Sequence, residues 1–423
     1  MSTATSGDRR FWDVDAQTMP RDRLRELQDA GVRELVRRIL EAPVPLFGGK
    51  LTEAGIDSSD DVGGVDDLAG IPTTVKQDLR DSEREHPPFG DYRFSGPERC
   101  VRLGTSTGTT GTPTIVLWTR HDLELEYDSA ARMFWRNGFR PGMVATHAHP
   151  AYLYGGGPLM SGAIEHFGML NLWVPPPDTD ELAEQGARLW ARVRPDVSFV
   201  AFSLDRYREV ADRHGLTLEL PSYRLGGGGG PGLPLMTAGI ECYAYAAGPC
   251  DESPGGHVHE DRVVVQAVDP ATGRDMPDGQ WGNLVVTTLG RDNALLRYDL
   301  EEACAVVRDP CPCGETTVRA FWGGRFKDLL QCQGKWFFVH ELEAALRAVP
   351  EVARPALVFQ AVRPAGDAAL RVRVESAEVS PDEVAARVRS SISSALGVVA
   401  EVDVLERGTL LRSGYKAVHI VDE

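Results

Sequence analysis

The sequence has no apolar run that approaches the roughly 20 residues needed to cross a bilayer. Its start, MSTATSGDRRFWDVD, lacks the apolar segment of a secretory signal, so we expect a cytoplasmic protein. Basic residues are outnumbered: 45 Lys and Arg face 62 Asp and Glu, for a net charge of −17. Because such a charge repels phosphate backbones and anionic lipids, binding to nucleic acid or to a membrane surface is disfavoured.

Cysteine is also scarce, with seven residues among 423. An odd number in a long acidic chain without a signal argues against a disulfide framework and favours a reducing compartment. Hydrophobic residues make up 42% and charged residues 25%, which is ordinary for a globular protein and excludes a disordered or fibrous chain. The length predicts two or three domains.

Strands and helices alternate along the first three quarters of the chain. Apolar residues at helical spacing predict a helix over 21–43, and IVLWT at 115–119 predicts a strand before a helix over 121–137. Further strands flank a helix predicted over 180–192, which favours an α/β sheet. Beyond Gly323 the pattern becomes a compact α+β unit. We therefore expect a large N-terminal α/β domain over 1–322 and a small α+β domain over 323–423.

The segment from Thr105 to Thr114 alternates hydroxyl residues with glycines between two apolar stretches. Glycines let backbone N–H groups approach an anion, and hydroxyls add further donors, so this loop can wrap a polyphosphate. It is not a Walker A loop, because no GKS or GKT ends it. A flexible linker is the alternative, but a linker has no need of the flanking strands.

This loop resembles the phosphate loop S-[ST]-G-T-T-G-x-P of the adenylate-forming superfamily, and other segments resemble phenylacetate–CoA ligases in particular. The resemblance runs from about residue 20 to the C-terminus. It implies that 1–322 is an adenylation core and that 323–423 is a mobile domain. The matching segments, in chain order, are LAGIPTTVKQDLR, VDPATGRDMPDGQWGNLVVTTL, LLRYDLEEACAVV, GRFKDLLQCQGKWFFVHELE and RSGYKAVHIVDE.

The resemblance implies two half-reactions. The carboxylate of a small acid, expected to be aromatic, attacks the α-phosphorus of ATP with Mg²⁺ and gives an acyl-adenylate and pyrophosphate. The thiol of CoA then displaces AMP. A homodimer is also expected from the family.

The resemblance also assigns roles to individual residues. Lys416 is expected to lie between the carboxylate and the α-phosphate, and Lys327 occupies the hinge position. Glu302, where the family usually has Asp, and Arg325 are expected at the ribose. The residues expected to bind the phosphates are Ser106, Thr107, Gly108, Thr109, Thr110 and Gly111. Those expected to line the acyl pocket are Tyr152, Tyr154 and Gly229.

Two departures from the family pattern leave alternatives open. The adenine-contacting motif lacks its Glu at 228–231, and 243–247 lacks the Glu that helps to hold Mg²⁺, with Glu241 and Glu252 as candidates to replace it. One alternative keeps the adenylate but changes the acceptor to an amine, a carrier-protein thiol or an inorganic nucleophile such as nitrite. Another is a nucleotide-binding module that has lost catalysis.

Cysteines and histidines form two further patterns. Cys250 with His257, and Cys311 with Cys313, resemble the C-x₆-H and C-P-C-G segments that hold structural Zn²⁺ in phenylacetate–CoA ligase relatives. The alternatives are buried free cysteines, or His259 as a substitute ligand. His147 and His149 suggest a metal or base site less strongly than a loop near the acyl pocket.

Overall fold

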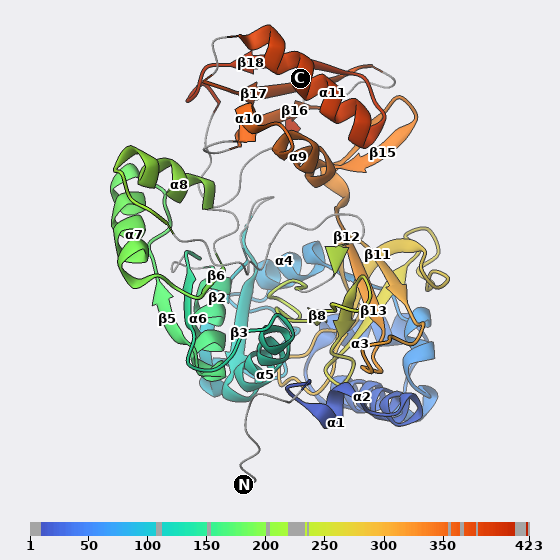
Figure 1. Cartoon of the computed structure of the whole chain (residues 1–423). Helices are drawn as coiled ribbons and strands as arrows, with labels where there is room; N and C mark the ends of the chain where they lie inside the picture. Colours follow the sequence, from blue (N-terminus) through green and yellow to red (C-terminus); the bar gives the residue numbers. More distant parts are fainter. Residues whose placement is uncertain are drawn as a thin grey trace. The chain divides into compact units, whose positions relative to one another are not determined.

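The computed structural model describes residues 10–106, 112–149, 154–199, 204–218, 233–234, 237–353, 357–363, 368–377, 380–410 and 420–421 (Figure 1). The chain divides into two compact units. Unit 1 comprises Met1–Gly142, Ala151–Met169 and Gly232–Gly323, and unit 2 comprises Met143–Pro150, Leu170–Pro231 and Gly324–Glu423. The residues predicted as the adenylation core, 1–322, therefore contribute to both units.

Unit 1 is built on a mixed sheet whose main strands run in the order β10-β11-β12-β13-β9-β8. Strands β10 and β11 form an antiparallel pair. The strands are β10 (Val263–Val268), β11 (Trp281–Thr288), β12 (Tyr298–Val307), β13 (Arg319–Arg325), β9 (Gly256–Val258) and β8 (Ala247–Pro249), with β1 (Thr74–Val75) beside β12 and β7 (Leu233–Pro234) beside β13.

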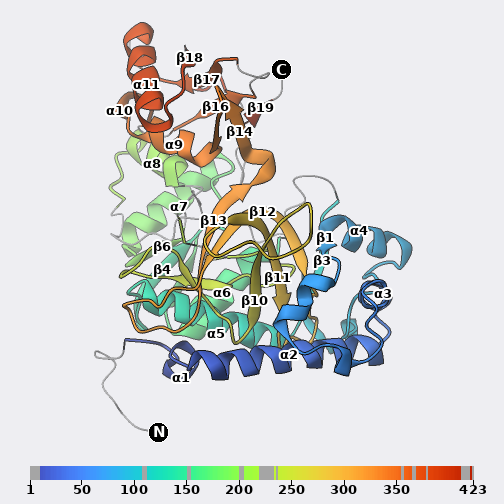
Figure 2. The same ribbon diagram turned by 90° about the vertical axis from the view of Figure 1, so that its right-hand side faces the viewer.

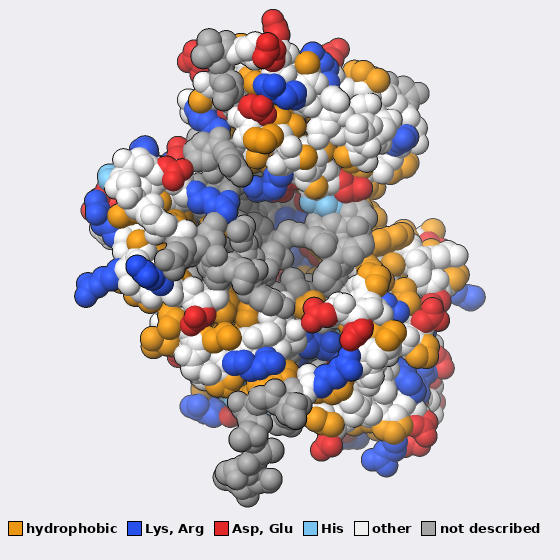
Figure 3. All heavy atoms as spheres, in the orientation of Figure 1, with side chains coloured by type: hydrophobic (Ala, Val, Ile, Leu, Met, Phe, Trp, Pro, Cys, Tyr) orange, Lys and Arg blue, Asp and Glu red, His pale blue; other side chains and the backbone are white. Residues whose placement is uncertain are grey.

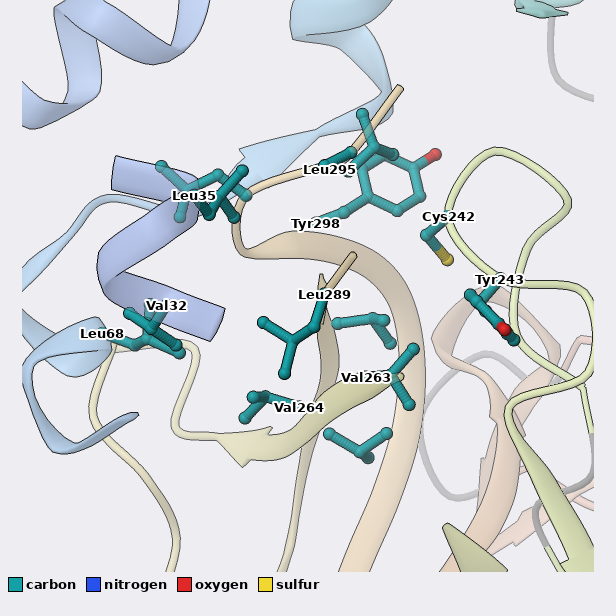
Figure 4. Packing of buried hydrophobic residues seen from close by; sticks show 14 of the residues in the cluster. Val32, Leu35, Leu68, Cys242, Tyr243, Val263, Val264, Leu289, Leu295 and Tyr298 are labelled. Atoms are coloured by element: carbon teal, nitrogen blue, oxygen red, sulfur yellow. The ribbon is translucent and has the colours of Figure 1, made fainter. Parts of the chain in front are cut away.

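Helices of unit 1 cover this sheet. The predicted helix over 21–43 is α2, and Figure 2 draws it below strands β10 and β11 of the sheet. Its Val32 and Leu35 belong to the same buried cluster as Val264 and Leu289 of the sheet region (Figure 4), and burial of each such side chain contributes about 1.5–3 kcal/mol. The helices are α1 (Val14–Gln17), α2 (Arg21–Glu41), α3 (Pro45–Glu53), α4 (Lys76–Glu85), α5 (Arg120–Arg136) and α6 (Gly156–Phe167).

A separate hairpin in unit 1 pairs β2 (Cys100–Thr105) with β3 (Ile115–Thr119). Helix α5 follows β3 directly, because the Thr119 side chain accepts a hydrogen bond from the Asp122 amide and so caps the helix. The hairpin thus fixes both ends of the segment that the sequence predicts to bind phosphate.

Unit 2 contains the parallel sheet β5-β4-β6, formed by β5 (Leu170–Trp173), β4 (Val144–His147) and β6 (Val197–Phe199), with helices α7 (Asp180–Val193) and α8 (Leu204–Arg213). Trp190 of α7 and Tyr207 of α8 pack with Ala148 and Val174, which follow the strands. The strands that the sequence predicts on either side of the helix over 180–192 are β5 and β6, whereas the apolar pattern predicts no strand at β4.

The C-terminal part of unit 2 has a four-stranded sheet in the order β18-β17-β16-β19. Val388 and Ile392 of helix α11 are buried with Val372 of the sheet, as expected for the predicted α+β unit. The elements are β14 (Leu329–Cys332), β15 (Lys335–Phe338), α9 (Val339–Arg347), α10 (Pro350–Ala353), β16 (Phe359–Val362), β17 (Leu370–Glu375), α11 (Pro381–Leu396), β18 (Ala400–Leu405) and β19 (Ile420–Val421). The alternation of strands and helices confirms the α/β class.

Charged side chains of both signs are interspersed with apolar ones on the face drawn in Figure 3. Among the described residues, no helix combines the length and the apolar content that a membrane crossing demands.

Candidate active site and metal centre

The predicted phosphate loop is closed at its base by Ser106 and Thr114. The Ser106 amide donates to the Thr114 carbonyl at 3.0 Å, and the Thr114 amide donates to Ser106 Oγ at 3.1 Å. Both residues are buried, and they continue the β2–β3 hairpin at the point where the loop leaves it. The predicted ligands Thr107, Gly108, Thr109, Thr110 and Gly111 lie outside the described residues.

A carboxylate and an ammonium group flank this base. Glu241 Oε1 lies 3.1 Å from the Thr114 hydroxyl and accepts a hydrogen bond of 2.7 Å from Lys76 Nζ at the start of α4. The Glu241 side chain is only 7% exposed, so this pair is held close to the loop with little screening by solvent. Sequence reasoning named Glu241 only as one of two substitutes and gave Lys76 no role.

The second substitute lies in a different setting. Glu252 pairs with Arg10 at 3.1 Å, and both side chains are more than half exposed. Glu252 lies two residues after Cys250, and no contact with the loop base is described for it. Of the two candidates, Glu241 is therefore the one placed at the phosphate loop.

The residues predicted at the ribose lie on neighbouring strands. Glu302 of β12 accepts a hydrogen bond of 2.7 Å from the indole nitrogen of Trp322 on β13. Arg325 ends β13 and belongs to unit 2, whereas Glu302 belongs to unit 1. Lys327 is in the 3₁₀ turn η4 (Phe326–Asp328), and its side chain lies outside the described residues. Lys416 also lies outside them. Trp322 was missed by sequence reasoning, because only the register of β12 and β13 brings it to Glu302.

The predicted acyl-pocket residues are described only in part. Tyr152 and Gly229 lie outside the described residues, whereas Tyr154 forms a parallel bridge with Thr105 at the entry to the phosphate loop. In unit 2, His147 ends β4 and pairs in register with Trp173 of β5 and Phe199 of β6. Burial lowers the pKa of His147 to about 3, so the imidazole is neutral and a poor base at physiological pH. This setting favours a wall residue over a catalytic base.

The predicted zinc ligands do converge. Cys250, His257, Cys311 and Cys313 place their ligand atoms within 4.8 Å of one another. Cys250 follows β8, His257 is the central residue of β9, and the two other cysteines lie in one turn between β12 and β13. His259 instead places its Nδ1 atom 3.0 Å from the Tyr245 carbonyl, and it is not part of this group among the described residues.

The separations fit a tetrahedral ion. Cys250 Sγ lies 3.6 Å from Cys311 Sγ, and Cys313 Sγ lies 3.4 Å from His257 Nε2. Ligands at ordinary Zn–S and Zn–N lengths in a tetrahedron are about 3.5–3.8 Å apart. The His257 Nδ1–H donates to the Thr317 carbonyl at 3.1 Å, which turns the Nε2 lone pair toward the cysteines. Burial lowers the pKa of His257 to about 3, so the ring is in the neutral form that binds metals.

The surroundings of the cluster suit thiolate ligands. Arg136 of α5 lies 3.6 Å from Cys313 Sγ and forms an ion pair with Glu315, and the Glu315 amide donates to the same sulfur at 3.3 Å. Burial raises the pKa of the Cys313 thiol to about 12, and the guanidinium and amide directed at its sulfur offset part of this effect by stabilising the negative charge. The cluster thereby connects two strands, a turn and helix α5 of unit 1.

Known proteins resemble this chain over nearly its full length. The family described as AMP-binding enzyme C-terminal domain matches residues 334–423. A protein of Thermus thermophilus named phenylacetate–coenzyme A ligase is 31% identical, over 97% of this chain and 99% of its own. A protein of the same name from Pseudomonas putida is 28% identical over 90% of each chain.

Solved structures are similar as well. A 2-hydroxyisobutyryl-CoA ligase in the postadenylation state, in complex with an acyl-AMP, has a TM-score of 0.85 at 22% identity, covering 99% of this chain and 94% of its own. The same ligase with 2-HIB-AMP and CoA in the thioesterification state has a TM-score of 0.70 with the same coverage. At this identity the likeness shows a common fold.

Proposed function

Because this chain belongs to the phenylacetate–coenzyme A ligase family and is an AMP-forming acid–CoA ligase, we propose that its acid substrate is aromatic. The enzyme activates a carboxylic acid with ATP as an acyl-adenylate and then forms the CoA thioester. The observation that carries the proposed substrate is the 31% identity, end to end, with a ligase named for phenylacetate.

The proposed roles follow the order of bond changes. A carboxylate oxygen of the acid bonds to the α-phosphorus as the bond to pyrophosphate breaks, and the CoA sulfur then bonds to the acyl carbon as AMP leaves. Ser106–Gly111 bind the β- and γ-phosphates, and Lys416 neutralises charge that develops at the α-phosphate. Glu302 and Arg325 bind the ribose, and Lys327 marks the hinge between the two half-reactions. Tyr152, Tyr154 and Gly229 line the acyl pocket.

A pyrophosphate-release screen tests this function. Wild-type protein with ATP and Mg²⁺ is offered aryl and alkyl acids, each with and without CoA. Arylacetic or benzoic acids should give the highest kcat/KM, and AMP release should require CoA. Preference for a short alkyl acid would contradict the aromatic substrate. Absence of pyrophosphate release with every acid would instead indicate a module that has lost catalysis.

We also propose that Mg²⁺ accompanies ATP and that Glu241 helps to hold it. A carboxylate is the ligand type that Mg²⁺ prefers, and this one lies at the base of the phosphate loop. Glu241→Gln should raise the Mg²⁺ concentration for half-maximal pyrophosphate release roughly tenfold at fixed ATP, because it removes one charged ligand. The measurement is a Mg²⁺ titration of the initial rate.

Glu252→Gln is the matched control, because it also removes one carboxylate but from an exposed pair. Its Mg²⁺ dependence should equal that of the wild type. If Glu241→Gln and Glu252→Gln titrate alike, Glu241 does not serve the metal.

The remaining proposals concern the state of the protein. Zn²⁺ is proposed at the four clustered ligands as a structural ion, since three cysteines and one histidine fill a tetrahedron and leave no open position. A cytoplasmic location is supported by seven cysteines without a disulfide among them. A homodimer is proposed from the family resemblance, and sedimentation equilibrium would measure it.

A further inference from the structure

The carboxylate of Glu302 is held by a tryptophan of the adjacent strand. The Trp322 indole N–H donates to Glu302 Oε2 at 2.7 Å, a short distance typical of a hydrogen bond to a charged acceptor. Both side chains are partly buried, and both residues lie in unit 1. The contact joins β13 to β12 through two residues that are 20 positions apart in the chain.

The indole is itself fixed in place. Trp322 pairs with Leu233 of β7 through its backbone, and its side chain packs against the main buried cluster of unit 1. Its ring has only two side-chain torsions, so little conformational freedom is lost when it donates this hydrogen bond. Trp322 therefore provides a rigid donor, whereas glutamate without such a partner samples many rotamers.

The hydrogen bond leaves chemical capacity on the carboxylate. An ionised carboxylate has about four lone-pair sites, so it can accept several hydrogen bonds at once, of which that of an indole N–H is one. Two vicinal hydroxyls, such as the 2′- and 3′-hydroxyls of a ribose, require acceptors in a defined orientation. A carboxylate anchored through Oε2 already has that orientation, so no side-chain conformational entropy is lost to fix it when the nucleotide binds.

We propose that Trp322 is a positioning residue for nucleotide recognition: it holds Glu302 in the rotamer that accepts hydrogen bonds from the ribose hydroxyls of ATP. This inference rests on the ribose role that the proposed function gives to Glu302. It adds a residue outside the motifs that the sequence resemblance identifies.

The test compares Trp322→Phe with the wild type in the full-length protein. Phenylalanine keeps an aromatic ring for packing but lacks the N–H donor. The KM for ATP should rise about tenfold, as expected for loss of a hydrogen bond to a charged group, while kcat stays within twofold. Calorimetric titration with ATP in the absence of acid should show the same loss of affinity.

Discrimination between nucleotides separates positioning from a general structural effect. The wild type should prefer ATP to 2′-deoxyATP, and Trp322→Phe should reduce this preference, because the 2′-hydroxyl contact is what the variant weakens. In Glu302→Gln the same Trp322→Phe change should have little additional effect, since residues that act through each other are not additive. Glu302→Asp keeps the charge but moves it back by one methylene, so it should also reduce the preference for ATP over 2′-deoxyATP. This variant replaces Trp322→Phe in the test if Trp322→Phe is unstable.

Trp281→Phe is the matched control, because Trp281 is 43% exposed on β11. It should leave the KM for both nucleotides unchanged. Equal losses of ATP and 2′-deoxyATP affinity in Trp322→Phe, or full additivity with Glu302→Gln, would overturn the inference. An active wild type whose ATP KM is insensitive to Glu302→Gln would overturn the ribose role together with it, whereas an inactive wild type would point to failure of the proposed function itself.

Discussion

Protein purified without chelators is expected to contain one zinc ion per chain, and Cys311→Ser should remove most of it. Two pairs of ligand atoms already lie close to tetrahedral separations, and all four lie within 4.8 Å of one another, so binding requires only a small contraction of the cluster. The ion would connect β8 and β9 to the 311–314 turn, which lies about 50 residues further along the chain. Loss of the site should lower the melting temperature by roughly 5–10 °C, given a loss of several kcal/mol in a chain of this size.

Cys100→Ser is the control for this experiment, because Cys100 is a partly buried free cysteine outside the cluster. It should keep its zinc and melt within about 2 °C of the wild type, as a substitution away from the site typically does. Metal content is measured by mass spectrometry and melting by calorimetry. Wild-type protein without zinc, or a Cys311→Ser variant with full zinc and unchanged melting, would show that the cluster is not a metal site.

The zinc ligands illustrate what sequence reasoning captures and what it does not. The pairs Cys250/His257 and Cys311/Cys313 are visible as short patterns, but their union depends on strand pairing. The register between β9 and β13 places His257 opposite Arg319. Because the turn with Cys311 and Cys313 directly precedes β13, this pairing brings the turn close to His257. Only the resemblance to a family indicates that the two pairs form one site, because periodicity does not show which distant segments come together.

Strand β4 shows a limit of periodicity itself. It has only four residues, and two of them are polar. These two, Thr146 and His147, are fully buried. Strand prediction relies on apolar or alternating patterns, and a short central strand with polar residues has neither. In contrast, α2 carries a long apolar stripe, and its predicted position is confirmed.

Long-range polar pairs are the other class that the sequence hides. Lys76 and Glu241 are 165 residues apart, and no local pattern links them. The segment TTVKQDLR was identified by resemblance, yet the partner of its lysine follows only from the tertiary structure. Trp322 and Glu302 are a second case, since their contact depends on the register of two strands.

Lys416→Ala is expected to reduce adenylate formation by roughly 10²–10³, the effect of losing one preorganised group at a developing charge. Lys416 lies outside the described residues, but the chain four residues later is anchored: Ile420 of β19 pairs with Ala361 of β16 in the C-terminal sheet. The strand that follows Lys416 in the chain therefore belongs to the C-terminal domain, and we expect the lysine to move with that domain. If the domain rotates about the hinge after adenylation, the lysine leaves the site before CoA attacks.

This argument predicts unequal effects on the two half-reactions. Thioester formation from supplied acyl-adenylate should change by far less than adenylate formation, because the α-phosphate then gains no further charge that needs Lys416. Single-turnover kinetics of each step measures both, with Lys335→Ala as the control, since Lys335 is an exposed lysine on β15 of the same domain. A Lys416→Ala variant that slows both steps equally, or neither, would remove the assignment of Lys416 and with it the main support for domain rotation in this enzyme.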